Sequence, residues 1–253
     1  MVDKKVTKQV KASIQENVTY LNSILPVSES FDLIQRDMII GEKQSTFYFI
    51  DGFTKDETML KIMTSFFDDM PSNATGFSKM ALPYVEVDII ADFDMIIRNI
   101  LSGVTCLFID GYEACIAIDC RTYPARGVEE PDKDKSLRGS RDGFVETIVF
   151  NTALMRRRIR DPHLVMKMIE IGNSSRTDVA VCYMSDRVDQ ELLDNLLKRL
   201  DTINVDALRM NQQSLAEELF KRKWFNPFPK FKFTERPDTA SVCLLEGKVV
   251  LLV

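Results

Sequence analysis

The sequence repeats a pattern of residues about halfway along its 253 residues. Leu33-Ile34 matches Leu164-Val165 and Gly41 matches Gly172, both at the same shift in numbering. Further matches keep the same order: Tyr48 and Asp51 with Tyr183 and Asp186, Leu21-Asn22-Ser23 with Phe150-Asn151-Thr152, and Leu101-Ser102-Gly103 with Leu245-Glu246-Gly247. A helix, a hairpin and a helix that recur in order indicate a duplicated αββα-type unit.

The apolar spacing predicts the elements of the first copy. They are a helix over 6–25, a hairpin of strands 31–40 and 45–50, a helix from Thr54 to Pro71, a loop over 70–83, a helix over 89–101, and a hairpin of strands 104–109 and 112–119 around Asp110-Gly111. The predicted fold is α/β of the α+β type. Two similar subdomains would each hold a small mixed or antiparallel sheet with hairpins packed by helices.

The expected boundaries are a first subdomain over 1–122, a charged linker and hinge over 123–142, and a second subdomain over 143–253. Residues 248–253 match 104–109, which lead into a return strand. We therefore expect the chain to continue past Val253 into a membrane domain and residues 248–253 to form an edge without its partner. A chain longer by about ten residues should then melt at a higher temperature.

The segment between the two copies predicts a buried helix. From Phe144 to Met155 the sequence leaves almost no polar stripe, so other elements should cover most sides of the helix. Asp142 and Glu146 place negative charge at its start, and Asp161-Pro162 stops it. Its end carries four arginines, which suits the helix dipole: Arg156, Arg157, Arg158 and Arg160.

Two interpretations remain open for the residues before this helix. Arg138, Gly139, Arg141 and Gly143 could form an anion pocket, because backbone N–H groups and guanidinium groups would converge there. They could equally form a connector whose arginines pair with carboxylates, together with Asp142. We favour the connector, since no phosphate-binding loop or dinucleotide motif is present.

The composition excludes several classes of protein. Apolar residues make up 45% and charged residues 28%, as in ordinary globular proteins, and the net charge of −5 argues against nucleic-acid binding. The five cysteines form no CxxC pair, which favours a reducing compartment. No apolar run is long enough to span a membrane, and the segment 1–25 is too charged for a signal peptide. We expect the given residues to behave as a soluble, cytosolic polypeptide.

The sequence shows no pattern of catalytic residues. His163 is the single histidine and lies far from any cluster of cysteines, so it is a poor candidate for a metal ligand. No GxSxG, HExxH or protease-like cysteine motif occurs. We therefore predict no catalytic residues, no metal, no cofactor and no enzymatic activity.

Two stretches near the end of the chain have distinct patterns. Residues 221–233 interleave basic and aromatic side chains. A strand with one buried face explains this best, ahead of a lipid-binding surface and then of single-stranded nucleic acid. Downstream, Glu235-Arg236-Pro237-Asp238 predicts the start of a short helix over 237–246 with a structural role, because proline and an acidic residue favour the first turn.

The sequence resembles the A subunit of GerA-type spore germinant receptors. The matching residues are Arg138 to Phe144, Glu146, Asn151, Leu154 and Arg156 to Ile159, then Glu235 to Asp238 and Leu245 to Gly247. The resemblance covers nearly the whole chain. Ser140 and Asp142 stand where the family often has Pro and Glu, which leaves that turn less rigid.

The resemblance implies a receptor complex in the inner membrane of bacterial spores. The A subunit would assemble with a transporter-like B subunit, a lipoprotein C subunit and further A subunits, and this domain would lie on the cytoplasmic or core side. Two hypotheses follow. The domain is an assembly module whose 138–160 segment couples lobe movement to the membrane part, or a bilobal module that closes on a small ligand. We favour assembly, because no ligand-binding lining can be identified in the sequence.

Overall fold

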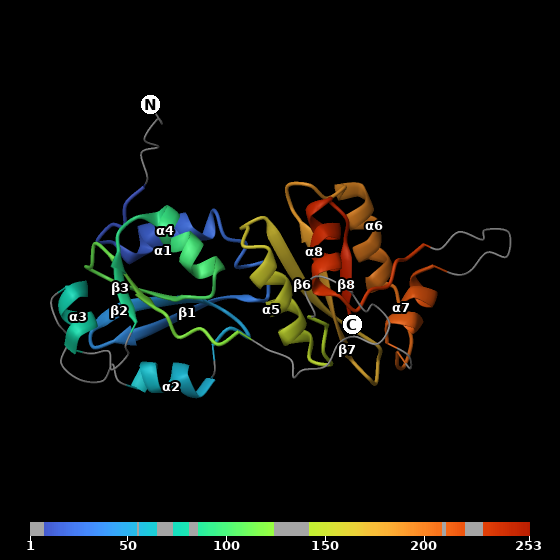
Figure 1. Cartoon of the computed structure of the whole chain (residues 1–253), viewed down its shortest axis with the longest axis horizontal. Helices are drawn as coiled ribbons and strands as arrows, with labels where there is room; N and C mark the ends of the chain where they lie inside the picture. Colours follow the sequence, from blue (N-terminus) through green and yellow to red (C-terminus); the bar gives the residue numbers. More distant parts are fainter. Residues whose placement is uncertain are drawn as a thin grey trace, which may run out of the picture. The chain divides into compact units, whose positions relative to one another are not determined.

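The computed structural model describes residues 8–54, 56–64, 73–80, 86–123, 142–208, 211–220 and 230–253 (Figure 1). The chain forms two compact units. Unit 1 contains Met1–Pro124 and Arg160–Pro162, and unit 2 contains Ala125–Ile159 and His163–Val253. The predicted residues Arg138, Gly139 and Arg141 lie outside the described residues.

Unit 1 is a five-stranded antiparallel sheet with helices on both faces. Its elements are α1 Ile14–Asn22, β1 Leu33–Ile40, β2 Lys43–Ile50, α2 Asp56–Thr64, α3 Ala74–Met80, β3 Val87–Ile90, α4 Phe93–Leu101, β4 Thr105–Ile109 and β5 Cys115–Ile118. The strand order is β1-β2-β4-β5-β3. One face packs Phe47 and Leu107 against Ile62 of α2 and Phe77 of α3. The opposite face contacts α1 and α4, where Phe93 stacks on Phe108.

Unit 2 repeats this arrangement with a smaller sheet. Its elements are α5 Ile148–Arg158, β6 Leu164–Ile171, β7 Thr177–Met184, α6 Gln190–Asp201, α7 Gln212–Leu219, α8 Pro237–Leu245 and β8 Val250–Leu252. The antiparallel strand order is β6-β7-β8. α5 and α8 pack on each other and on β7 and β8. Leucines of α6 and α7 pack against Val179 and Val181. The predicted class, α/β with two similar units built on antiparallel sheets, is confirmed.

A buried asparagine in each unit shows how the two copies correspond. Asn17 accepts from Lys11 N (2.9 Å) and donates to Lys11 O (2.7 Å). Asn151 bonds Val145 in the same way, at 2.8 and 2.6 Å. The first helices of the two units therefore align Asn17 with Asn151. The predicted match of Asn22 to Asn151 is wrong.

The strand registers correct a second match. Leu33 pairs with Ile50, and Leu164 pairs with Met184. The difference in residue number between matched positions is therefore three larger for β2 and β7 than for β1 and β6. Tyr48 then corresponds to Cys182 and not to Tyr183. The difference arises in the hairpin loops, which are two residues long between β1 and β2 and five residues long between β6 and β7.

Three other predicted elements of unit 1 are wrong in part. The helix predicted over 89–101 is split, because residues 87–90 pair with β5 and Asp92 caps α4 by accepting from Asp94 N at 2.8 Å. The loop predicted over 70–83 contains α3, whose first turn is capped by Asn73. The predicted first helix over 6–25 shortens to α1, since Val10 lies in an extended segment bonded to Ala91 O.

Candidate functional site

The start of α5 differs from the sequence prediction. The helix begins at Ile148, five residues after Gly143, because the Asn151 amide bonds both backbone groups of Val145 and holds residues 145–147 outside the helix. Asn151 to Arg156 are buried, as predicted for this helix, but Phe150 is 45% exposed. One face of α5 is therefore accessible at Phe150.

A hydrogen bond joins the two sequence motifs of unit 2, and each motif contains an ion pair of its own. Phe144 N donates to Glu235 O at 2.9 Å. Arg158 donates to Asp142 Oδ2 at 2.6 Å from the last turn of α5. Arg236 donates to both carboxylate oxygens of Asp238, from Nε at 3.0 Å and from a terminal nitrogen at 2.6 Å. We call Asp142, Arg158, Glu235, Arg236 and Asp238 the motif cluster.

Each arginine of the motif cluster pairs with a carboxylate. The Arg236 fork holds the pKa of Asp238 below its usual value, and the charge of Arg158 lowers it further. Asp238 also accepts from Thr239 N at 2.7 Å, which satisfies a backbone donor in the first turn of α8. Arg158 and Arg236 each have a carboxylate partner. The choice between an anion pocket and a connector at Arg138, Gly139 and Arg141 lies outside the described residues and stays a prediction.

Acidification should destabilise unit 2 through Asp238. Because the pKa of Asp238 is lower in the folded than in the unfolded chain, its contribution is present above the unfolded pKa of about 4 and is lost as the pH falls through the lowered pKa. We expect Asp238→Asn to reduce stability at pH 7 and to flatten the fall in melting temperature below about pH 4. Melting curves from pH 3 to pH 7 would measure this. Equal acid slopes for wild type and variant would contradict it, and the exposed Asp201→Asn serves as the control.

Arg156 has a role that sequence reasoning missed. It was predicted, with Arg157, Arg158 and Arg160, to place positive charge at the C-terminal end of the helix. Its side chain is instead fully buried. Arg156 donates to Leu164 O at 2.9 Å and so fixes the start of β6 to α5. Arg157 and Arg160 are exposed, and Arg160 belongs with unit 1.

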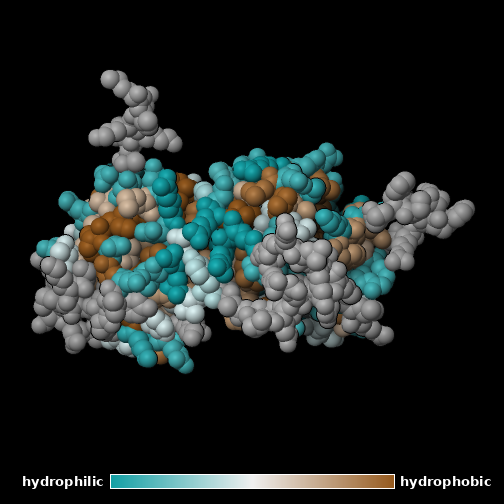
Figure 2. All heavy atoms as spheres, in the orientation of Figure 1, coloured by the Kyte–Doolittle hydropathy of each residue, from teal (hydrophilic) through white to brown (hydrophobic). Residues whose placement is uncertain are grey.

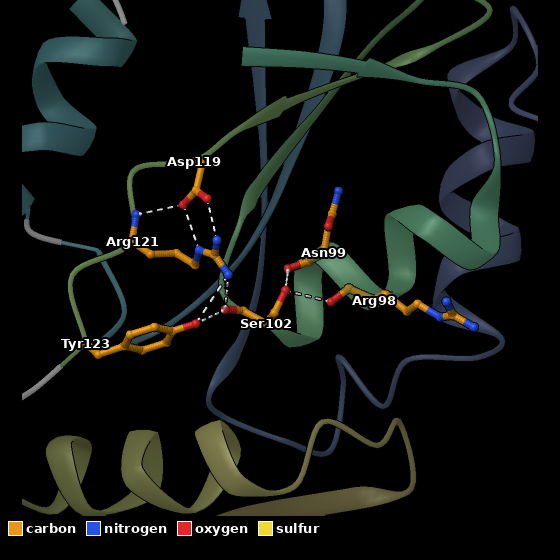
Figure 3. Close-up of polar contacts among 6 residues, drawn as sticks. All are labelled: Arg98, Asn99, Ser102, Asp119, Arg121 and Tyr123. Carbon is orange, nitrogen blue, oxygen red and sulfur yellow. Dashed lines mark hydrogen bonds and ion pairs between the residues drawn. The ribbon is translucent and has the colours of Figure 1, made fainter. Parts of the chain in front are cut away.

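In unit 1 a polar group holds the chain where the predicted linker begins. Figure 3 shows Arg121 and Tyr123 pointing toward Ser102 at the end of α4. Tyr123 Oη donates to Ser102 O at 2.9 Å, and Arg121 donates to the same oxygen at 3.4 Å. A cation at a helix C-terminus is favourable, since unpaired carbonyls gather there. Ser102 Oγ in turn donates to Arg98 O and Asn99 O.

Asp119 completes this group. We call Ser102, Asp119, Arg121 and Tyr123 the Arg121 latch. Arg121 Nε donates to Asp119 Oδ1 at 2.6 Å, and a terminal nitrogen bonds the other oxygen. The bond to Arg121 holds the pKa of Asp119 below its usual value, whereas the same bond raises the pKa of Arg121. Thr122 N donates to Phe53 O at 2.6 Å, so residues 119–123 are anchored on both sides.

Neither group is arranged as a metal site. Within the described residues, no three His, Cys, Asp or Glu side chains are placed to hold a metal ion, and His163 is therefore not part of such a group there. Four cysteines are buried as free thiols: Cys106, Cys115, Cys120 and Cys182. No helix in the described part of the chain has the length and apolarity to span a bilayer.

Known proteins identify the family of the chain. A model of the Bacillus/Clostridium GerA spore germination protein family matches residues 19–253. The chain belongs to this family. It is 35% identical to stage V sporulation protein AF of Bacillus subtilis over 94% of the chain and 49% of that protein. It is 27% identical to spore germination protein B1 of B. subtilis, over 97% of the chain and 51% of that protein.

A solved structure shares the fold of this GerA-family chain. The N-terminal domain of the A subunit of the Bacillus megaterium spore germinant receptor GerK3 superposes with a TM-score of 0.69 and 21% identity, covering 98% of this chain and 94% of that domain. The chain spans about half the length of the curated relatives it matches. The predicted family resemblance is confirmed. The roles of the predicted site residues and the predicted boundaries over 1–122, 123–142 and 143–253 stay predictions.

Proposed function

We propose that this GerA-family chain is the N-terminal domain of a germinant receptor A subunit and acts in spore germination as an assembly and signal-coupling module, without catalysis. The observation that carries this is the motif cluster, in which Phe144 N bonds Glu235 O and the charge of Arg158 lowers the pKa of Asp238 at the α5–α8 pair. A group built this way fixes helices together. Its arginines already have carboxylate partners and are poorly suited to receive a substrate anion.

The described residues on either side of the predicted linker are each bonded within their own unit. Tyr123 donates to Ser102 O at the end of α4, and Phe144 N donates to Glu235 O in unit 2. We infer that the segment 138–160 couples movement of the units to the rest of the protein.

The partners proposed for this module are the B and C subunits and further A subunits. It would be attached to the inner spore membrane by the remainder of the protein and would lie on the cytoplasmic or core side. The name of the GerK3 structure supports an A-subunit role, as do the spore germination proteins among the relatives. No nucleic-acid partner is proposed.

Spores that carry a disrupted motif cluster would test the proposal. We expect Arg158→Ala, introduced into the complete receptor protein, to slow nutrient-triggered germination by tenfold or more and to reduce co-purification of the other subunits. Arg157→Ala is the matched control, since this neighbour on α5 carries the same charge and is exposed. Normal germination and normal co-purification in Arg158→Ala spores, at normal receptor levels, would overturn the proposal.

The presence of two similar units is also compatible with an alternative function, a module that binds a small molecule. A thermal-shift screen of the chain with amino acids, sugars and nucleotides separates the two functions. A ligand at a hundred times its dissociation constant should stabilise the chain by about 2.7 kcal/mol. Saturable stabilisation of this size would favour the binding module, whereas no response to the whole set is the result expected for an assembly module.

A further inference from the structure

The described sheet of unit 2 ends at β8, whereas the corresponding strand of unit 1, β4, has a neighbour on each side. In unit 1, β4 lies inside the sheet between β2 and β5, and all five of its residues are buried. In unit 2, β8 pairs with β7 on one side only, as far as the described residues show, and Val250 and Leu251 are half-exposed. Figure 2 shows apolar residues at the surface of this face of unit 2, where Val242 and Leu245 of α8 are exposed.

The helices and strands at this place correspond residue by residue. Gly103 N donates to Ile100 O (2.8 Å) and Val104 N to Asn99 O (2.9 Å) after α4. After α8, the same two bonds run from Gly247 N to Leu244 O (2.9 Å) and from Lys248 N to Cys243 O (3.0 Å). Both glycines have positive φ, +94° and +83°. The α4–β4 and α8–β8 segments therefore align with Gly103 on Gly247.

The same alignment assigns a counterpart to β3. It places Phe231 to Thr234 on Val87 to Ile90. Phe231 packs against the unit 2 core that also contacts Val249 and Leu251, just as Val87 packs against the unit 1 core. The described residues of unit 2 thus contain counterparts of β4 and β3, but none of β5, which pairs with both of them in unit 1.

The start of α5 shows the same difference. In unit 1, the turn after β4 reaches α1: Asp110 Oδ1 accepts from Ile14 N at 3.0 Å, and Gly111 N donates to Ala12 O at 2.7 Å. The counterpart of Ile14 is Ile148. The N-cap side chains of α1 and α5, Ser13 and Thr147, make no capping bond of their own. In unit 1 Asp110 supplies the acceptor for Ile14 N, and among the described residues no side chain does so for Ile148 N. An edge strand and a helix start without this outside acceptor therefore point to the same segment.

We propose that unit 2 accepts one antiparallel β-strand between β8 and residues 231–234, joined to β8 by an acidic-glycine turn whose carboxylate caps α5. The occupant is a hairpin-return strand of the same protein, because in unit 1 the equivalent strand follows β4 directly through the turn 110–114. The curated relatives are about twice as long as this chain and so have residues for such a strand. Closing the sheet beside α5 and α8 would tie the motif cluster to the residues that follow.

An extended chain tests this proposal. The segment 110–118 of unit 1, DGYEACIAI, would be fused directly after Val253, and a second fusion would carry the same acidic-glycine turn with a plain threonine–valine strand. We expect either fusion to raise the melting temperature by about 5 °C. It should also slow amide exchange in β8 and in residues 231–233 by tenfold or more. Replacing two alternate strand residues by proline should abolish both effects, since proline cannot complete the ladder.

Several outcomes would count against the proposal. Unchanged melting and unchanged β8 exchange in both fusions would overturn it. Formation of a dimer through β8 by the chain ending at Val253 would also overturn it, because the occupant would then be a second copy. Replacing the appended aspartate by alanine should remove the protection of Ile148 N–H alone. Retained protection there would refute the capping part.

Discussion

Arg156→Ala is expected to lower the free energy of unfolding of unit 2 by about 3–5 kcal/mol, one of the two largest effects we predict. The Arg156 side chain is the largest of those that are fully buried. Its removal leaves a cavity beside α5 and takes away the donor that bonds Leu164 O at 2.9 Å. A buried carbonyl without its partner adds a desolvation penalty to the cavity cost. Urea denaturation followed by circular dichroism measures the change.

The neighbouring arginine supplies the matched control for this variant. Arg157 is exposed on the same turn of α5, so Arg157→Ala should stay within about 0.5 kcal/mol of wild type. Arg156→Met fills most of the volume without a donor and should fall between the two. A loss below about 1 kcal/mol for Arg156→Ala would show that α5 and β6 do not depend on this contact.

The sequence was sufficient for elements marked by strong local signals. The helix predicted over 237–246 is α8, which begins at Pro237 and is followed by Gly247. The repeat around Gly41 and Gly172 predicted two similar units. These features are set by residues close in the chain, such as a glycine that adopts positive φ or a proline in the first helical turn.

Other features depend on contacts that the sequence does not reveal. Arg156 and Arg157 are adjacent and chemically identical, and the contacts that bury Arg156, among them its bond to Leu164 O, come from the fold and not from the local sequence. The start of α5 was predicted too early because the Asn151 amide competes with the helix for Val145. Helix α4 was merged with β3, since Ile89 and Ile90 suit either structure until the pairing with β5 is known.

The candidate site was found in parts and not as a whole. Both motifs of the motif cluster were singled out in the sequence, but the family resemblance, and not spacing, connected them. Arg158 and Asp238 are far apart in the sequence, and nothing local predicts that the charge of one lowers the pKa of the other. The Arg121 latch was not predicted, because its acceptor, Ser102 O, is a backbone group.

The paired asparagines give the second large effect. Asn17→Ala and Asn151→Ala should each cost about 2–3 kcal/mol, because each removes two bonds between a buried side-chain amide and the backbone. Asn17→Ala should raise amide exchange in unit 1, and Asn151→Ala should raise it in unit 2. Hydrogen exchange measured segment by segment distinguishes the two. Asn173→Ala is the control, since the side chain of this asparagine bonds only another exposed side chain, that of Asn204.

The two asparagine variants also test whether the corresponding asparagines contribute similarly to the stability of the two units. Asp in place of Asn keeps the acceptor for the N–H of Lys11 or Val145 but loses the donor to its carbonyl, so Asn17→Asp and Asn151→Asp should each retain part of the stability. Similar losses of stability in both units would mean that the same pair of asparagine–backbone bonds stabilises the start of the first helix in each unit. If Asn151→Ala cost nothing while Asn17→Ala remained destabilising, the turn before α5 would be held by the motif cluster alone, through the bond from Phe144 N to Glu235 O.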